Sequence, residues 1–144
     1  MRTKAAKNDV RRPAVRGVAI KRIYAAPESA DGYRVLIDRL WPRGISKERA
    51  AIDVWLRDLA PSTVLRTWFH HDPTRWPEFS RRCRVELRAQ SGLLENLRQK
   101  ARSQRVTLLY GARDARFNQA TVLREVLRRG APQAATRRAR ARRP

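Results

Sequence analysis

The sequence predicts an α/β protein: a small, partly parallel sheet of at least three strands, packed with four or five helices in a single domain. Two apolar runs, residues 35–37 and 106–110, lack polar alternation, which is typical of strands covered on both faces. Between them lies a long stretch with apolar residues three and four positions apart, a helical pattern. A helical crossover between strands favours a parallel sheet. The 144 residues suffice for one such domain and are too few for two.

The first elements expected along the chain are two strands. Residues 18–24 (VAIKRIY) alternate loosely between apolar and polar side chains, and residues 33–40 contain the apolar run of the second strand. The loop between them, APESADG, is rich in small and turn-forming residues. From Ser46 onward the pattern is helical for a long way, and Ser46 is suited to cap a helix that begins KERAA.

Residues that start or stop helices interrupt this helical stretch. Ser62 is expected to cap a second helix, and Asp72 followed by Pro73 has the sequence of an N-cap and a first helical residue. Proline inside a helix removes a backbone hydrogen bond, so the regular part of the next helix is expected to begin near Pro77. Gly92 is expected to end that helix.

Two helices and one strand complete the expected order. Residues 93–101 have the pattern of an amphipathic helix, residues 106–110 (VTLLY) form the third strand, and a last helix stops before Gly130. Cys83 lies on the apolar face of the helix that precedes Gly92, where burial would keep its thiol unreactive. That face is formed by Trp76, Phe79, Cys83 and Leu87.

Charge divides the chain into a domain and two basic ends. The formal net charge is +21; residues 1–22 contain eight Lys or Arg and one acid, and residues 128–144 contain seven Arg and no acid. Neither end has the apolar periodicity needed to offset the entropy of ordering. The sequence therefore predicts a disordered basic arm over residues 1–15, a domain over 16–129 and a disordered Arg-rich tail over 130–144. Such ends either bind polyanions through counterion release or only keep the protein soluble.

Several functional classes lose support because their motifs are absent. Cys83 is the only cysteine, so the chain can form neither an intrachain disulfide nor a CxxC zinc or redox motif. The absence of GxGxxG, GxxxxGKS/T and GxSxG argues against dinucleotide oxidoreductases, P-loop NTPases and ordinary serine hydrolases. No nucleotide-cofactor motif is present, and the sequence indicates no particular cofactor. No apolar run approaches the roughly 18 residues that span a membrane, so we expect a cytoplasmic protein without a membrane partner.

Polar clusters follow two of the expected strands at the point where each strand ends. The second strand runs into residues 38–44 (DRLWPRG), and the third runs into residues 111–114 (GARD). Ligands of open α/β sheets bind outside the carboxyl ends of the strands, so the clusters would form one site if these strands are parallel neighbours. Arginines and the first amides of the last helix would suit a small anion, with a carboxylate available for acid–base work. The candidate residues are Asp38 and Asp114 for catalysis, and Arg39, Trp41, Arg43, Tyr110, Arg113 and Asn118 for ligand binding.

Each of these residues alone also has a structural explanation. Asp38 would pair with a neighbouring arginine and hold its own loop. Asp114 or Asn118 would cap a helix. Trp41, whose backbone is kept extended by the following proline, would anchor the core. Both explanations stay open at this level, although the coincidence of two polar strand ends favours a site.

His70, His71 and Asp72 form the only other conspicuous cluster, and the chain has no further histidine. His71 could carry a proton, and Asp72 could contact a ligand in addition to starting a helix. A metal site is not expected, because three well-placed ligands are not visible in the sequence.

Several separated motifs make the sequence similar to a known family. They resemble the YeaO-like family of bacterial proteins, a domain of unknown function, and the resemblance covers about residues 17–128. It implies a compact single α/β domain and no particular activity. The motifs are DRLWPRGISKE at 38–48, DVWLRDLAPS at 53–62, WFHHDP at 68–73, TLLYGARD at 107–114 and NQA at 118–120.

Two residues depart from the pattern that the resemblance implies. Cys83 stands where the family commonly has Tyr, and Gln119 stands where it commonly has His. If the Tyr and His are catalytic in relatives, this chain has lost or changed that activity. If they only pack, the departures have no chemical consequence.

Three functional hypotheses follow from the residues. The first is a small anionic ligand, phosphorylated or carboxylated, held by the strand-end arginines, with a carboxylate as base and His71 as proton carrier. The second is nonspecific nucleic-acid binding through the basic ends. The third is a scaffold or interaction protein without a catalytic site. Enzymatic activity, the ligand's identity and the oligomeric state are not indicated by the sequence.

Overall fold

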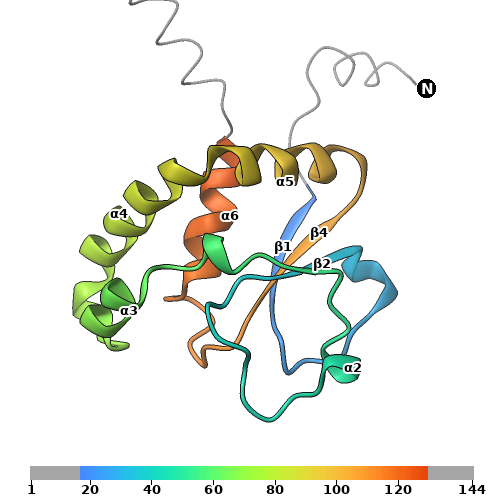
Figure 1. Cartoon of the computed structure of the whole chain (residues 1–144), viewed down its shortest axis with the longest axis horizontal. Coiled ribbons are helices and arrows are strands. Elements are labelled where there is room, and N and C mark those ends of the chain that lie inside the picture. The colour runs from blue at the N-terminus through green and yellow to red at the C-terminus, as the bar shows by residue number, and fades with distance from the viewer. Residues whose placement is uncertain (1–16, 130–144) are drawn as a thin grey trace, which may run out of the picture.

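The computed structural model describes residues 17–129 and shows a parallel four-stranded sheet (Figure 1). The strands are β1 (Val18–Arg22), β2 (Tyr33–Leu36), β3 (Val54–Trp55) and β4 (Val106–Tyr110), in the spatial order β1-β4-β2-β3. Every neighbouring pair in this sheet is parallel. The predicted α/β class and single compact domain are therefore confirmed, and the sheet is parallel throughout rather than in part.

Strand β3 was not predicted from the sequence. The pattern predicts helix from Ser46 onward, but α2 (Lys47–Ala50) is a single turn that ends because Ala51 is left-handed, with φ of 48°. Residues flanking β3 then donate backbone hydrogen bonds to the carbonyls of Arg34 (2.8 Å) and Leu36 (2.9 Å), which places β3 beside β2. A strand of two residues is too short to show a period of two, so no sequence signal marks it.

Helix caps lie where the sequence predicts them. The Ser62 hydroxyl accepts a hydrogen bond from the Leu65 N–H (3.1 Å), and the Asp72 carboxylate accepts one from the Thr74 N–H (3.0 Å). The next α-helix begins one residue before Pro77, near the predicted position. The 3-10 helix η1 (Ser29–Asp31) lies between β1 and β2. The helical elements that follow β3 include η2 (Arg57–Leu59), α3 (Thr63–Phe69), η3 (Pro73–Arg75) and α4 (Trp76–Leu87).

Gly92 does not end a helix, contrary to the prediction. Helix α4 leads directly through η4 (Arg88–Gln90) into α5 (Ser91–Ser103), and Gly92 lies in the first turn of α5. No atom lies within 4 Å of the position that a Cβ would take at Gly92, so neither crowding nor a turn requires glycine there. Figure 1 shows α4 and α5 as one continuous bent helix. Helix α6 (Gln119–Arg129) packs on β1 and β4 and contacts both α4 and α5.

The two faces of the sheet are covered by different parts of the chain. Successive strand residues point to opposite faces, so Val35 and Leu108 join the helical core while Leu36 and Leu109 face the other way. Helices α3 to α6 cover the first face, and the loop over residues 38–52 covers the second. This double cover explains why the strands lack polar alternation. The second core consists of Ile23, Leu36, Ile45, Ala50 and Leu109, with Trp41, Ile52 and Trp55 packed against it.

A buried charge cluster fastens the covering loop to the sheet. The Asp31 carboxylate and the Arg34 guanidinium are 6% and 4% exposed and lie 2.6 Å apart. Arg34 also donates to the carbonyls of Ala50 (2.7 Å) and Ala51 (2.9 Å), and Lys21 contacts Asp31 at 3.0 Å. Asp31 is the only carboxylate among residues 17–129 that forms an ion pair with Arg34, so removing Asp31 would leave a buried guanidinium without a counter-charge.

Replacing either of two glycines, Gly32 or Gly92, by alanine tests the path of the backbone, because the two substitutions should change the free energy of unfolding in opposite directions. Gly32 has φ of 68°, and a Cβ there would lie 2.3 Å from the Arg105 carbonyl oxygen. We expect Gly32→Ala to lower the free energy of unfolding by about 2 kcal/mol or more, since it combines left-handed strain with a backbone clash. Gly92→Ala should raise it by up to about 1 kcal/mol, because alanine is the better helix former. Urea unfolding measures both, and a neutral Gly32→Ala would contradict this loop geometry.

Candidate functional site

The carboxyl ends of β2 and β4 open into one depression of about 730 Å³. The two strands are direct parallel neighbours, with Leu36 opposite Leu109, so the condition that the sequence analysis set is met and their polar ends lie side by side. The end of α3 and the start of α6 complete the wall. The lining includes seven of the ten predicted site residues: Asp38, Arg39, Trp41, Arg43, His71, Arg113 and Asn118.

Asp38 joins the parts that form this depression. Its two carboxylate oxygens accept hydrogen bonds from the Gly111 N–H (3.0 Å) and the Gln119 side-chain amide (2.7 Å). A Cβ at position 111 would lie 2.7 Å from the Asp38 carboxylate, so glycine permits this close approach. Burial raises the pKa of Asp38 to about 6, although the bonds from Gly111 and Gln119 and the charge of Arg66 oppose that rise. Asp38 therefore changes protonation close to neutral pH.

Four arginines line the same depression: Arg39, Arg43, Arg66 and Arg113. Asp38 is the single carboxylate in the lining, and none of these arginines forms an ion pair with a carboxylate of residues 17–129. Arg39 donates to the carbonyls of Pro61 (3.2 Å) and Ala60 (2.9 Å), which fixes its guanidinium. The depression therefore carries positive charge that the described part of the chain leaves uncompensated.

The start of α6 is closed by its own cap. Asn118, 2% exposed, accepts hydrogen bonds from the N–H groups of Ala120 (2.9 Å) and Thr121 (3.1 Å). These amides, which the sequence suggested as anion donors, are therefore occupied. Asp114 is exposed and accepts from the N–H groups of Phe117 and Arg116, and these bonds lower its pKa. Asn118 therefore caps α6, which is the structural explanation considered for it in the sequence. Asp114 stabilises the turn that precedes α6.

The histidine pair follows α3 in an unusual backbone conformation. His70 and His71 both have positive φ, 47° and 54°, and both are exposed. Such conformations cost free energy of the order of 1 kcal/mol or more each, and they concentrate at functional sites. His71 lies on the wall of the depression, with its ring 6.3 Å from that of Phe69. Its position leaves the predicted proton-carrying role open to test.

Three predicted residues lie outside the lining. Asp72 caps η3 and forms an ion pair with Arg75 (3.6 Å), and its hydrogen bonds from Thr74 lower its pKa. Tyr110 is 3% exposed in the core, and burial raises its pKa. Asp114 points into its own turn, as described above. None of the three is placed for direct contact with a ligand in the depression.

Trp41 has both of the roles considered for it. Its indole N–H donates to the Ile45 carbonyl (2.8 Å), and its ring meets that of Trp55 edge-on at 5.4 Å. It therefore anchors the covering loop while one part of it lines the depression.

Two functional candidates were not predicted as site residues. Gln119 donates to Asp38, yet the sequence marked it only as a departure from the family pattern. Arg66 lines the depression from α3, near enough for its charge to lower the pKa of Asp38. No strand-end or motif signal points to Arg66, because only the folding of α3 brings it to the site.

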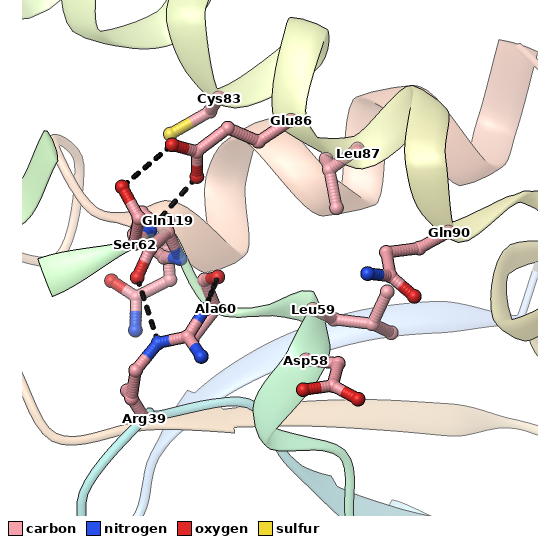
Figure 2. Close-up of a pocket in the computed structure, with 11 residues that line it drawn as sticks. Arg39, Asp58, Leu59, Ala60, Ser62, Cys83, Glu86, Leu87, Gln90 and Gln119 are labelled. Carbon is pink, nitrogen blue, oxygen red and sulfur yellow. Dashed lines mark hydrogen bonds between the residues drawn. The ribbon is translucent and has the colours of Figure 1, made fainter.

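A smaller cavity of about 200 Å³ (Figure 2) shares part of its lining with the depression. Arg39, Ala60, Pro61 and Gln119 line both spaces. Cys83 also lines this cavity, and burial raises the pKa of its thiol to about 12, which keeps it protonated. The two departures from the family pattern, Cys83 and Gln119, therefore face the same cavity.

Residues 17–129 contain no cluster of three or more His, Cys, Asp or Glu side chains arranged to hold a metal ion. In this described part of the chain, every helix is too short or too polar to cross a membrane.

Comparisons with known proteins give a consistent family relationship. The model of the DUF488-N3i family, described as the inactive DUF488-N3 subclade, matches residues 17–143. The uncharacterised protein YeaO of Escherichia coli (strain K12) is 40% identical over 111 residues, which cover 77% of this chain and 96% of that protein. The uncharacterised proteins Mb3100c of Mycobacterium bovis and Rv3073c of Mycobacterium tuberculosis are each 39% identical, over 76% of this chain and 92% of theirs. No solved structure shows a significant match.

Replacing Asp38 by Asn should change the pH dependence of stability. The folded-state pKa of about 6 exceeds the ordinary 3.8, so the folded protein binds more protons and loses stability as pH rises from about 4 through 6. The total loss is about 3 kcal/mol at most, at about 1.4 kcal/mol per pH unit. Asn retains an acceptor for Gly111 and can donate to a reoriented Gln119 amide. We therefore expect the stability of Asp38→Asn relative to wild type to rise across this range.

Urea unfolding at pH values between 4 and 8 measures this difference. Asp38→Ala provides the control, because it removes both hydrogen bonds and should destabilise the protein at every pH. A constant difference between wild type and Asp38→Asn across the range would contradict the buried setting of this carboxylate.

Proposed function

The chain belongs to the DUF488-N3i family, and from this premise we propose that it binds a small anionic molecule, phosphorylated or carboxylated, in the depression at the carboxyl end of its sheet. The family description as an inactive subclade supports binding rather than turnover as the principal role.

One observation carries the proposal: four arginines and a single carboxylate line the depression. The carboxylate oxygens of Asp38 already accept two hydrogen bonds, and no ion pair joins Asp38 to any of these arginines. Guanidinium groups present several donors in a planar fork that matches carboxylate and phosphate oxygens. An anion would therefore supply the negative charge that residues 17–129 do not provide.

The arginines divide into a fixed one and three exposed ones. Arg39 is held by two backbone carbonyls and would offer a preorganised donor, which lowers the entropic cost of binding. Arg43, Arg66 and Arg113 are exposed and would close on the ligand from the rim. Asp38 would act as the proton-exchanging group in any acid–base step, because its pKa of about 6 lies near neutrality. His71 would relay protons from the rim.

Nucleic-acid binding through residues 1–15 and 130–144 is the competing proposal, and its support is charge alone. Those residues lie outside the described part of the chain. The scaffold alternative requires strand-end charges that neutralise one another, whereas Asp38 forms no ion pair with Arg39 or Arg43 in residues 17–129. The open depression therefore supports ligand binding better than a closed scaffold.

Anion binding can be tested with phosphate and sulfate on the full-length chain by calorimetry at physiological ionic strength. We expect Arg43→Ala and Arg66→Ala each to weaken phosphate binding by about tenfold, the effect of losing one charge-assisted hydrogen bond. Arg129→Ala is the matched control, since this exposed arginine ends α6, about 15 Å along the helix from its first residue, Gln119.

The pattern among these variants separates the hypotheses. Equal phosphate binding by wild type, Arg43→Ala and Arg129→Ala would place the binding elsewhere, on the basic ends or the general surface. A polyanion affinity that collapses with salt and is insensitive to Arg43→Ala would favour nucleic acid.

A further inference from the structure

The cavity of about 200 Å³ beside the depression has polar side chains that no other part of the described chain engages. Asp58 and Gln90 line it, and neither forms a side-chain hydrogen bond or an ion pair within residues 17–129. Figure 2 shows these two residues on the side of the cavity opposite Ser62 and Gln119. By contrast, Glu86 is occupied, since it accepts from the Ser62 N–H (2.8 Å) and hydroxyl (2.6 Å). Asp58 and Gln90 are therefore the groups available to a guest.

The rest of this lining combines apolar side chains with the polar side chains of Arg39, Ser62, Glu86 and Gln119. Leu59, Cys83 and Leu87 are buried residues that face the cavity, and the protonated thiol adds no charge. A guest that fits would have one apolar face against these side chains and several hydroxyl donors for the carboxylate and amide oxygens. The Asp58 carboxylate would repel a second anionic group at this end of the ligand.

The size of the cavity limits the guest to one small ring or a short chain. A volume of about 200 Å³ equals the liquid volume of about seven water molecules, and an engineered cavity of about 150 Å³ in another protein holds benzene. One sugar ring of five or six atoms is of this size.

Two residues connect the cavity to the depression. Arg39 lines both spaces, and its Nη1 has no acceptor among the described residues, whereas Nε and Nη2 are bonded to backbone carbonyls. Gln119 also lines both, and its amide nitrogen donates to Asp38, which leaves its carbonyl oxygen as an acceptor. A molecule that spans the shared wall would place its anion among the arginines and its neutral part against Asp58 and Gln90.

We infer that the ligand is a phosphorylated sugar, with its phosphate in the arginine-lined depression and its hydroxyl-bearing ring in the adjoining cavity. This inference rests on the proposed anion-binding function and adds the chemical class of the ligand. The two spaces select different parts of one molecule: charge is selected by the arginines, and hydroxyls with an apolar ring face are selected by the cavity.

Calorimetry on the full-length protein tests the inference with five probes: inorganic phosphate, glucose 6-phosphate, ribose 5-phosphate, adenosine monophosphate and unphosphorylated glucose. We expect at least one sugar phosphate to bind about tenfold or more tightly than phosphate, and glucose to bind too weakly to measure. Gln90→Ala should weaken binding of that sugar phosphate by about fivefold, the loss of one neutral hydrogen bond, and leave phosphate binding unchanged. Gln99→Ala, an exposed glutamine on α5 outside this cavity, should change neither.

A second variant controls for effects on folding. Cys83→Phe fills the cavity with a larger side chain and should abolish the preference for the sugar phosphate while phosphate still binds, which also shows that the variant is folded.

Three results would overturn the inference and leave anion binding intact. The first two are sugar phosphates that bind no more tightly than phosphate, and a Gln90→Ala variant that binds the sugar phosphate and inorganic phosphate with an equal loss of affinity. Tighter binding of adenosine monophosphate than of ribose 5-phosphate would also overturn it, because a base would then occupy the cavity. Failure of every anion to bind would instead overturn the proposed function itself.

Discussion

The bridge made by Asp38 is the interaction on which the rest of the site depends. Its carboxylate lies at the end of β2 and accepts from the Gly111 N–H after β4 and from Gln119 at the start of α6. One half-buried carboxylate thus fixes two strand ends and a helix relative to one another. The cost appears as the raised pKa of Asp38, since burial disfavours its charge more strongly than the two hydrogen bonds and Arg66 favour it. Protonation near neutral pH would weaken this bridge, so site geometry and pH are linked.

The parallel sheet explains why the site is open at one end and closed on both faces. Helices α3 to α6 cover one face. The loop over residues 38–52 covers the other, where its Trp41 packs on Trp55 of β3 and its Ala50 carbonyl accepts from the buried Arg34. The polar residues that remain open to a ligand lie where the strands leave the sheet. The same loop supplies Arg39 and Arg43 to the depression, so the residues that cover the second core also carry its charge. Substitutions in this loop should affect stability and binding together.

Capping and ligand binding compete for the same polar residues at the strand ends. Asn118, Asp114 and Asp72 satisfy backbone amides, which leaves them little capacity for a ligand. Within residues 17–129, the side chains of the four arginines have no hydrogen-bond partners apart from the two carbonyls that hold Arg39. Because of this division, Asn118, Asp114 and Asp72 stabilise the backbone, whereas the four arginines line the open depression. The positive charge that residues 17–129 leave uncompensated in the depression is the feature that would attract an anionic ligand.

The sequence by itself determined the strands β1, β2 and β4, the caps at Ser62 and Asp72, and the concentration of polar residues after two strands. These features depend on local patterns of neighbouring residues, which a sequence displays directly. The sequence did not predict β3, because a strand of two residues is too short to show a period of two. It predicted a helix end at Gly92, but the low helix propensity of glycine is weaker than the packing that holds α5 in place. Only the tertiary structure decided which strands are neighbours, that Asp38 meets Gly111 and Gln119 across 73 and 81 residues of chain, and that Arg66 reaches the same depression. Such contacts arise from the parallel crossover and from long-range packing, and no local pattern encodes them.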